Sequence, residues 1–237
     1  LSGWHTLEVM TAEPGEPLLR QVRTWQAALR DAQVHGLALF MILGVSIRLL
    51  PGMFGLPKVN ERRAWIALGL LTAAVLLECT LLVASQAFDL HALAAGLLVP
   101  WILLPVGVAL VIWPWKLWRP VRFPDRSAKF VRIAYGWLFV SFVLLLFLPV
   151  YQWLHGSAFS HAYYGAARHA ITVGFVSMMI VGISSKMVPG LRGMDVRALP
   201  ALWTTFILVN LGCLLRVSLQ IASDWTPIAF GLIGFSG

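Results

Sequence analysis

Residues 41–52, MILGVSIRLLPG, return later in the chain as residues 179–190, MIVGISSKMVPG. Six of these twelve positions are identical and five more are close substitutions, among them Arg48 to Lys186. The offset between the copies is 179 − 41 = 138 residues. Each copy is an apolar run that ends in a Pro-Gly pair, which disfavours further helix. The repeat therefore predicts two related helices that end near these pairs.

The composition places this repeat in a lipid bilayer. Apolar side chains make up 59% of the 237 residues and charged ones only 12%, against about 25% charged in a typical soluble domain. Since a span needs about 20 apolar residues, we expect six full spans and a truncated seventh that begins at Thr226. The expected spans are 33–54, 64–88, 92–118, 130–153, 167–188 and 201–222. The predicted fold is an all-α polytopic transmembrane helix bundle with a parallel internal repeat, offset by four helices.

The positive charges predict the orientation of the bundle. Lys and Arg concentrate in the connections between spans one and two, three and four, and five and six. The alternate connections hold only Arg168, at the end of one of them. By the positive-inside rule the basic connections are expected in the cytoplasm. The net charge of +8 is thereby explained by topology, which argues against nucleic acid as a partner.

The first 32 residues differ from the rest of the chain. A segment from Pro17 is predicted to form an amphipathic helix in the outer membrane interface. Its apolar face would consist of Leu18, Val22, Trp25 and Leu29. The alternative is the remnant of a soluble domain. Residues 33–237 are predicted to form the transmembrane bundle. Because the chain starts at Leu1 and stops inside the seventh span, we interpret it as part of a longer polypeptide.

All histidines are expected on the outer side of the membrane. They are His5, His35, His91, His155, His161 and His169. His35 and His169 begin the two repeated helices, and His169 lies four residues before the strict counterpart of His35, so that the two would share a helix face. Imidazole is a common ligand of haem iron and copper, and helical bundles hold such cofactors between histidine-bearing helices. We therefore predict a metal site with His35, His161 and His169, and haem propionates paired with Arg168.

Further candidates surround this predicted site. Ionisable groups inside a span are expensive, so they are functional candidates; these are Glu78 and Arg216. Near the predicted outer surface the candidates are His91, His155, Tyr163 and Tyr164. The small side chains of Ala170, Thr172 and Gly174 are expected to let a porphyrin approach the backbone. Cys79 and Cys213 are interpreted as apolar filling.

Cations near the other end of the repeated helices are expected to be structural. Arg48 and Lys186 would extend to the cytoplasmic interface and interact with the helix C-terminal dipole. The tryptophans that close spans three and four are expected in the interfacial belts; they are Trp113, Trp115, Trp118 and Trp153.

Two segments carry a resemblance to a known family. DAQVHGLALFMILGVSIRLLPG (31–52) and ARHAITVGFVSMMIVGISSKMVPGLRG (167–193) resemble the paired histidine-bearing helices of the NnrS family, and HAITVG at 169–174 is the most specific part. The resemblance implies a bacterial inner-membrane protein that contains haem b and copper. It also implies a role in the response to nitric oxide or its detoxification, with the histidines on the periplasmic side. An oxidoreductase activity on this or another diatomic gas, with an electron donor or partner membrane subunits, is left open.

The catalytic subunit of haem–copper oxidases is similar in architecture, because helices four apart in its sequence are equivalent. By that likeness this chain is the second half of a protein with about twelve spans. His35 would then lie near copper and His169 near haem.

Two other classes of protein remain as alternatives. One is a transporter or channel whose polar residues in the spans line a path, and the other is a structural subunit of a respiratory or photosynthetic membrane complex. A parallel repeat and histidines on one side favour the haem protein, whereas inverted repeats are common in secondary transporters.

Overall fold

The computed structural model describes residues 16–88, 91–117, 119, 125–156, 159–196 and 199–235. His5 and Trp118 lie outside these residues, and so do the side chains of Leu18 and His91. The described residues form helices joined by turns, with no strand among them. Six of these helices are long and apolar enough to cross a membrane. The prediction of a multi-pass, all-α membrane protein is therefore confirmed.

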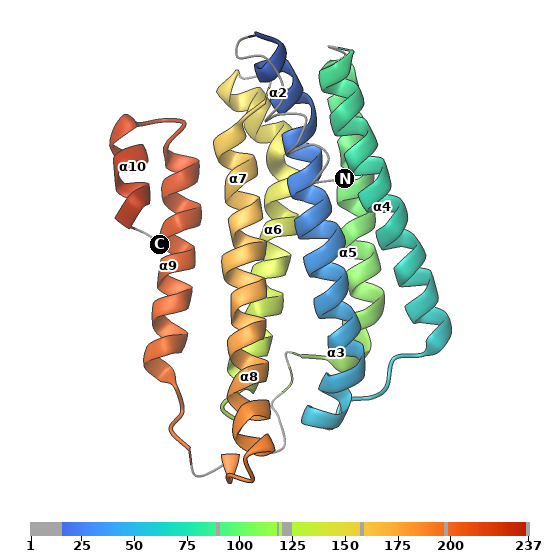
Figure 1. Cartoon of the computed structure of the whole chain (residues 1–237), viewed down its shortest axis with the longest axis vertical. Coiled ribbons are helices and arrows are strands. Elements are labelled where there is room, and N and C mark those ends of the chain that lie inside the picture. The colour runs from blue at the N-terminus through green and yellow to red at the C-terminus, as the bar shows by residue number, and fades with distance from the viewer. Residues whose placement is uncertain are drawn as a thin grey trace. The chain divides into compact units, whose positions relative to one another are not determined.

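Figure 1 colours the helices from the N-terminus to the C-terminus of the chain. α2 (Glu16–Asp31), η1 (Ala32–Ala38) and α3 (Leu39–Phe54) follow one another directly, and α4 is Glu61–Ala87. The third span consists of η2 (His91–Leu97), α5 (Leu98–Ile112) and η3 (Trp113–Trp115), and the fourth is α6 (Ala128–His155). The fifth consists of α7 (His161–His169), η4 (Ala170–Ser177) and α8 (Met178–Leu191). α9 (Trp203–Ala222) is followed by the short α10 (Pro227–Leu232) and η6 (Ile233–Phe235).

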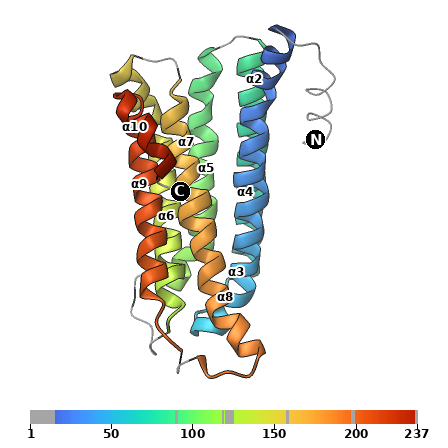
Figure 2. The same ribbon diagram turned by 60° about the vertical axis from the view of Figure 1, so that its left-hand side comes forward.

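The chain divides into two compact units. Unit 1 comprises Leu1–Leu43 and Val59–Val111, and unit 2 comprises Gly44–Lys58 and Ile112–Gly237. Within unit 1, α4 packs against α2 and η2. Within unit 2, α6 packs against η4, α7 and α8, while α7 and α9 run side by side in Figures 1 and 2. Each unit is thus a bundle of long helices held by lateral packing.

The amphipathic segment that was expected as a separate helix is helical, but it continues into the first span without a break. α2 packs against α4, where Ala28 is buried and Arg23 Nε donates to Gln86 Oε1 at 2.9 Å. Its placement in the outer interface stays a prediction.

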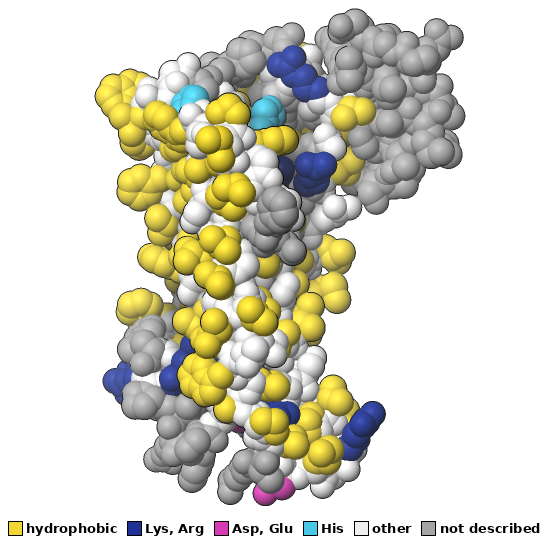
Figure 3. Space-filling view, turned by 90° about the vertical axis from the view of Figure 1, so that its left-hand side faces the viewer, with side chains coloured by type: hydrophobic (Ala, Val, Ile, Leu, Met, Phe, Trp, Pro, Cys, Tyr) yellow, Lys and Arg dark blue, Asp and Glu magenta, His cyan; other side chains and the backbone are white. Residues whose placement is uncertain are grey.

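Large apolar side chains cover the outer faces of the helices. Phe139 is 67% exposed and Ile207 is 55% exposed. Figure 3 shows apolar side chains along the middle of one face, with Lys and Arg gathered toward its ends. A soluble protein seldom exposes so continuous an apolar surface, so the surrounding medium is the lipid bilayer.

Two tryptophans at helix ends are exposed as predicted, namely Trp113 and Trp153. The prediction is wrong for Trp115, which is buried and donates from Nε1 to Pro57 O at 3.2 Å. A buried indole N–H needs an acceptor, and the Pro57 carbonyl of the loop after α3 provides it.

The repeated helices share a feature that the sequence pattern does not reveal. η1 and η4 are π-helices, and they begin at residues 32 and 170, so that their offset is 170 − 32 = 138 residues. This offset equals that of the sequence repeat. The Pro-Gly pairs lie inside the last turns of α3 and α8. α3 ends at Phe54, where the first span was predicted to end, and α8 ends at Leu191, a few residues beyond the predicted end of the fifth span. π-helical turns are rare and often occur at functional sites.

Gly174 in η4 lies directly against α6. A Cβ atom at this position would overlap the ring of Trp137. Trp137 Nε1 in turn donates to Asn210 Oδ1 of α9 at 2.9 Å. The expectation that Gly174 exposes backbone to a porphyrin is therefore wrong, because an indole ring already fills that space.

This packing predicts opposite effects for two glycines of unit 2. Gly174→Ala should lower the free energy of unfolding by about 1–3 kcal/mol, because the added methyl group forces the Trp137 ring to move. Gly136→Ala in α6 meets open space and should stabilise the helix by about 0.5–1 kcal/mol. Thermal unfolding of both variants in detergent measures the difference. Equal midpoints would contradict the packing described here.

Candidate functional site

His35 lies inside the π-helix η1 and is buried, with 1% of its surface exposed. Its Nδ1 atom is 2.7 Å from Oε2 of Glu78 in α4. The other carboxylate oxygen, Oε1, accepts a hydrogen bond of 2.8 Å from Trp101 Nε1 in α5. Three helices of unit 1 thus contribute one side chain each to a buried chain of hydrogen bonds.

The amino-acid sequence of α4 explains why Glu78 points inward. The buried residues of α4 recur at helical spacing and form one face that includes Glu78; the others are Ala67, Leu71, Ala74, Leu82 and Ser85. Gly36, beside His35, packs next to Val75 of α4, and a Cβ atom there would lie 3.4 Å from Val75 Cγ1, at ordinary contact distance. A buried carboxylate is costly unless it is hydrogen-bonded, and both oxygens of Glu78 accept such bonds.

The hydrogen bond to Glu78 determines which nitrogen of His35 can bind a metal. An ionised carboxylate only accepts, so we assign the shared proton to Nδ1. Nε2, which is also buried, then carries the lone pair. Histidine ligands in metal sites commonly have this arrangement, with a carboxylate that orients the ring and raises its basicity. His35 is therefore suited to bind a metal through Nε2.

His169 is the last residue of α7 and directly precedes η4. Arg216 Nε of α9 is 3.5 Å from His169 Nε2, and Arg216 Nη1 donates to Ile233 O at 3.0 Å. Because a guanidinium group only donates, Nε2 of His169 is the accepting nitrogen. The neighbouring Arg168 guanidinium lies 4.4 Å from the ring centroid of Tyr164. Unit 2 therefore brings together two predicted cations and His169.

The expectation that His35 and His169 occupy the same face of the repeated helices stays a prediction. It rests on a displacement of four residues, which is about one α-helical turn. The four residues in question, from position 169 to 173, enter the π-helix η4, whose turns are wider. His35 lies within its π-helix, whereas His169 lies immediately before its own.

His155 and Tyr163 belong to a separate aromatic cluster. The rings of Tyr151 and Tyr163 stack at 4.2 Å, and His155 is 4.8 Å from the ring of Trp225. The His155 ring nitrogen Nε2 is 3.1 Å from Asp224 O. These contacts tie the end of α6 to α7 and to the turn after α9, so we interpret both residues as structural. Sequence reasoning missed Tyr151 and Asp224.

His161 is exposed and meets the ring of Phe159 edge-on at 5.0 Å. Among the described residues, no three histidine, cysteine or acidic side chains form a group that could hold a metal. Haem iron requires only one or two protein ligands, so this finding is compatible with haem. A copper site generally uses several nitrogen or sulfur ligands, and the described residues hold no such group. Copper and its ligation by His161 stay predictions.

The two cysteines behave as predicted for apolar filling. Both are free thiols, and Cys213 is fully buried beside Ala166 and Ala170. Cys79 is half-buried, and its Sγ lies 3.4 Å from Ala28 O. Ala170 is thus core packing between η4 and α9, like Gly174 between η4 and α6.

Comparison with known families gives one match. Residues 18–235 match the model of the NnrS protein family, which covers nearly the whole chain and contains both repeated helices. No curated protein and no solved structure gives a significant match.

Because Trp101 donates a hydrogen bond to Glu78, removing the indole N–H should destabilise the protein only while the Glu78 carboxylate is present. Trp101→Phe should lower the free energy of unfolding by about 1–2 kcal/mol, because a buried carboxylate oxygen loses its donor. Trp65→Phe is the matched control: Trp65 also donates to a glutamate of α4, at 3.5 Å on the exposed surface, and should cost less than about 0.5 kcal/mol.

A double-mutant cycle separates this hydrogen bond from simple loss of packing. In a Glu78→Met background, which has no carboxylate to satisfy, Trp101→Phe should cost at least about 0.5 kcal/mol less than in the wild type. An unchanged cost would show that the indole contributes by volume alone.

Proposed function

The chain belongs to the NnrS family, and on that premise we propose that it binds haem b with His35 and His169 as metal ligands and takes part in the response to nitric oxide. Each of these histidines lies in or beside one of the two π-helices that the internal repeat places at matching positions. Each also has Nε2 as its basic nitrogen by the hydrogen-bond assignment above. Two similar donors on duplicated helices support a cofactor role for both.

The observation that carries the proposal is the buried hydrogen bond between His35 and Glu78. Both side chains are at most 1% exposed within an apolar bundle. Burying such a pair carries a desolvation cost. Apolar side chains at the same positions would stabilise a membrane span at least as well, so stability alone does not explain the pair. The pair is understandable if Glu78 orients the imidazole and increases its basicity toward a metal.

The surroundings of His169 support an anionic haem. The Arg216 guanidinium group is 3.5 Å from this half-buried imidazole, and Arg168 directly precedes His169 in the chain. Haem propionates pair well with arginine, which can donate two parallel hydrogen bonds to a carboxylate. The 3.5 Å contact between Arg216 Nε and His169 Nε2 is at the long limit of a hydrogen bond, so exchanging it for a metal bond costs little.

When bound, haem would supply an iron atom that binds diatomic gases such as nitric oxide. In unit 1, His35 would bind iron through Nε2. In unit 2, His169 would bind iron through Nε2, and Arg168 and Arg216 would hold the propionates. Glu78 would keep the proton on Nδ1 of His35, which leaves the lone pair of the neutral ring on Nε2. Turnover of nitric oxide requires an electron donor in addition, and the proposal is restricted to binding.

Absorption spectra of the purified protein test the ligands. We expect a Soret band and stoichiometric iron in the wild type, and loss of most of the haem in His35→Ala and in His169→Ala, because each change removes an iron ligand. His155→Gln is the control, since His155 serves the aromatic cluster, and it should retain haem. Circular dichroism confirms that the variants fold. Absence of haem from the wild type, or full retention in both alanine variants, would contradict the proposal.

The carboxylate has a separate test. Glu78→Gln should weaken haem binding by about 10–100-fold, the usual effect of removing a carboxylate partner of a ligating histidine. Glu61→Gln, at the exposed start of the same helix, should leave the affinity unchanged. Titration of the haem-free protein with haem, followed by absorbance, measures both. Equal affinities would mean that Glu78 does not act on the metal ligand.

A further inference from the structure

Unit 2 contains a cavity of about 1060 Å³ at the end of the bundle remote from His169. It lies where α6 and α9 begin and α8 ends. By the distribution of Lys and Arg, this end is the one predicted to face the cytoplasm. The cavity plays no part in the haem proposal.

Cationic side chains dominate the polar lining of the cavity. Arg126 lies just before α6, Lys129 and Arg132 lie in its first turns, and Lys186 comes from α8. Two carboxylates, those of Asp125 and Asp195, also line it. The net charge of these six groups is 4 − 2 = +2.

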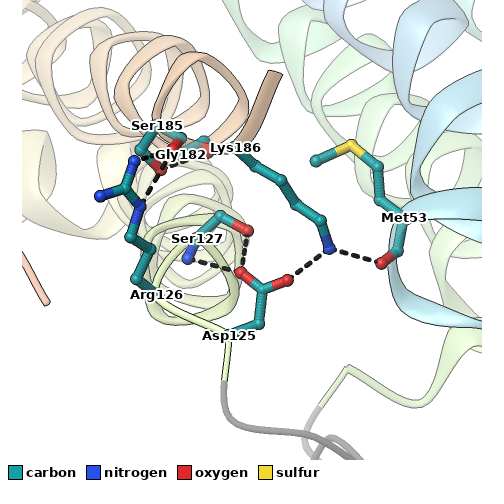
Figure 4. Close-up of polar contacts among 7 residues, drawn as sticks. All are labelled: Met53, Asp125, Arg126, Ser127, Gly182, Ser185 and Lys186. Atoms are coloured by element: carbon teal, nitrogen blue, oxygen red, sulfur yellow. Dashed lines mark hydrogen bonds and ion pairs between the residues drawn. The ribbon is translucent and has the colours of Figure 1, made fainter. Parts of the chain in front are cut away.

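Asp125 forms an ion pair with Lys186 (Figure 4). The Lys186 ammonium group contacts the Asp125 carboxylate and donates to Met53 O at 2.7 Å, while Ser127 N donates to Asp125 Oδ1 at 2.8 Å. Burial by itself raises the pKa of the Asp125 carboxyl. The hydrogen bonds from Lys186 and Ser127 lower this pKa by more than burial raises it, so the pKa lies below its usual value. At neutral pH this aspartate is ionised and neutralises Lys186 rather than the other cations.

The remaining cations meet neutral carbonyl groups. Arg126 Nε donates to Ser185 O at 3.0 Å and its Nη1 donates to Pro200 O at 3.3 Å. Lys129 Nζ donates to Ala201 O, and Arg132 Nη2 donates to Arg119 O. A carbonyl acceptor holds a cation in place but does not cancel its charge. The cavity is therefore preorganised for an anion.

The rest of the wall is apolar and faces the lipid. Ile133 and Trp203 line the cavity and are exposed, and Phe206 lies beside them. The Lys129 ammonium group sits 3.8 Å from the ring centroid of Trp203, and tryptophan at a helix end is typical of the membrane interface. Positive charge and apolar wall thus meet where lipid headgroups join acyl chains.

We propose that this cavity binds the headgroup of an anionic phospholipid, with the phosphodiester on Arg126, Lys129 and Arg132 and the acyl chains along Ile133 and Trp203. Basic pockets between membrane helices on the cytoplasmic side are suited to such headgroups. A free phosphate ion would use the cations alone and would gain nothing from the apolar wall.

Titration of the detergent-solubilised chain tests the proposal. Phosphatidylglycerol, phosphatidylcholine or glycerol phosphate is added, and thermal unfolding and native mass spectrometry report binding. We expect phosphatidylglycerol to raise the unfolding midpoint and remain bound in the mass spectrometer. Equal effects of phosphatidylcholine would overturn the charge argument, and equal effects of glycerol phosphate would replace the lipid by a free anion.

Variants locate the binding. Lys129→Gln with Arg132→Gln should weaken phosphatidylglycerol binding about 25-fold, at roughly fivefold for each cation near the headgroup. Arg62→Gln with Arg63→Gln removes the same charge from the exposed start of α4 and should have little effect. Equal losses in the two pairs, or no loss in the first, would refute the site. Arg132→Gln alone spares the contacts of Arg126 and Lys129, and a fivefold loss is expected even if the double variant does not fold.

Discussion

The buried Glu78 carboxylate constrains how the helices of unit 1 pack, because both of its oxygens need hydrogen-bond donors. In the hydrocarbon region every polar group must find a partner within the protein, and this carboxylate is completely buried. Its two oxygens require two donors from two different helices, so His35 and Trp101 fix how η1 and α5 meet α4. Apolar contacts allow neighbouring helices to slide and rotate, whereas this pair of hydrogen bonds permits one register. A single costly residue thus positions the imidazole that the proposed cofactor needs.

The two copies of the repeat have kept their backbone and changed their contacts. Both carry a π-helix at the same place and a proline in the last turn. Lys186 reaches Asp125, but its counterpart Arg48 is exposed. Gly182 packs closely on α6, where a Cβ atom would be 2.9 Å from Phe130 Cβ, whereas its counterpart Gly44 meets open space. The duplication therefore preserves helix geometry, and the side chains have diverged with their neighbours.

The six full spans could be predicted because lipid imposes a simple rule on composition, and each of the six coincides with a helix long and apolar enough to cross a membrane. The candidate site was only partly predictable. Glu78 was identified as an unusual ionisable residue, but its partner Trp101 resembles any other apolar residue of α5, since only packing reveals its hydrogen bond. The roles of Gly174 and Trp115 were misjudged because a small residue or a tryptophan has the same sequence pattern in a lipid-facing surface and in a packed core. The π-helices were missed because their signal lies in backbone hydrogen bonding.

A π-helical turn also changes the phase of a helix. One extra residue in a single turn rotates all the residues that follow by about 100° about the helix axis, relative to an uninterrupted α-helix. Residues 21–31 and 39–54 therefore present faces to their neighbours that no single helical wheel can describe. Moving the wide turn along the chain by a residue would turn a different side chain inward without any insertion or break. A π-helical segment thus determines which side chains a membrane helix turns toward its neighbours, and the described residues include two such segments, η1 and η4.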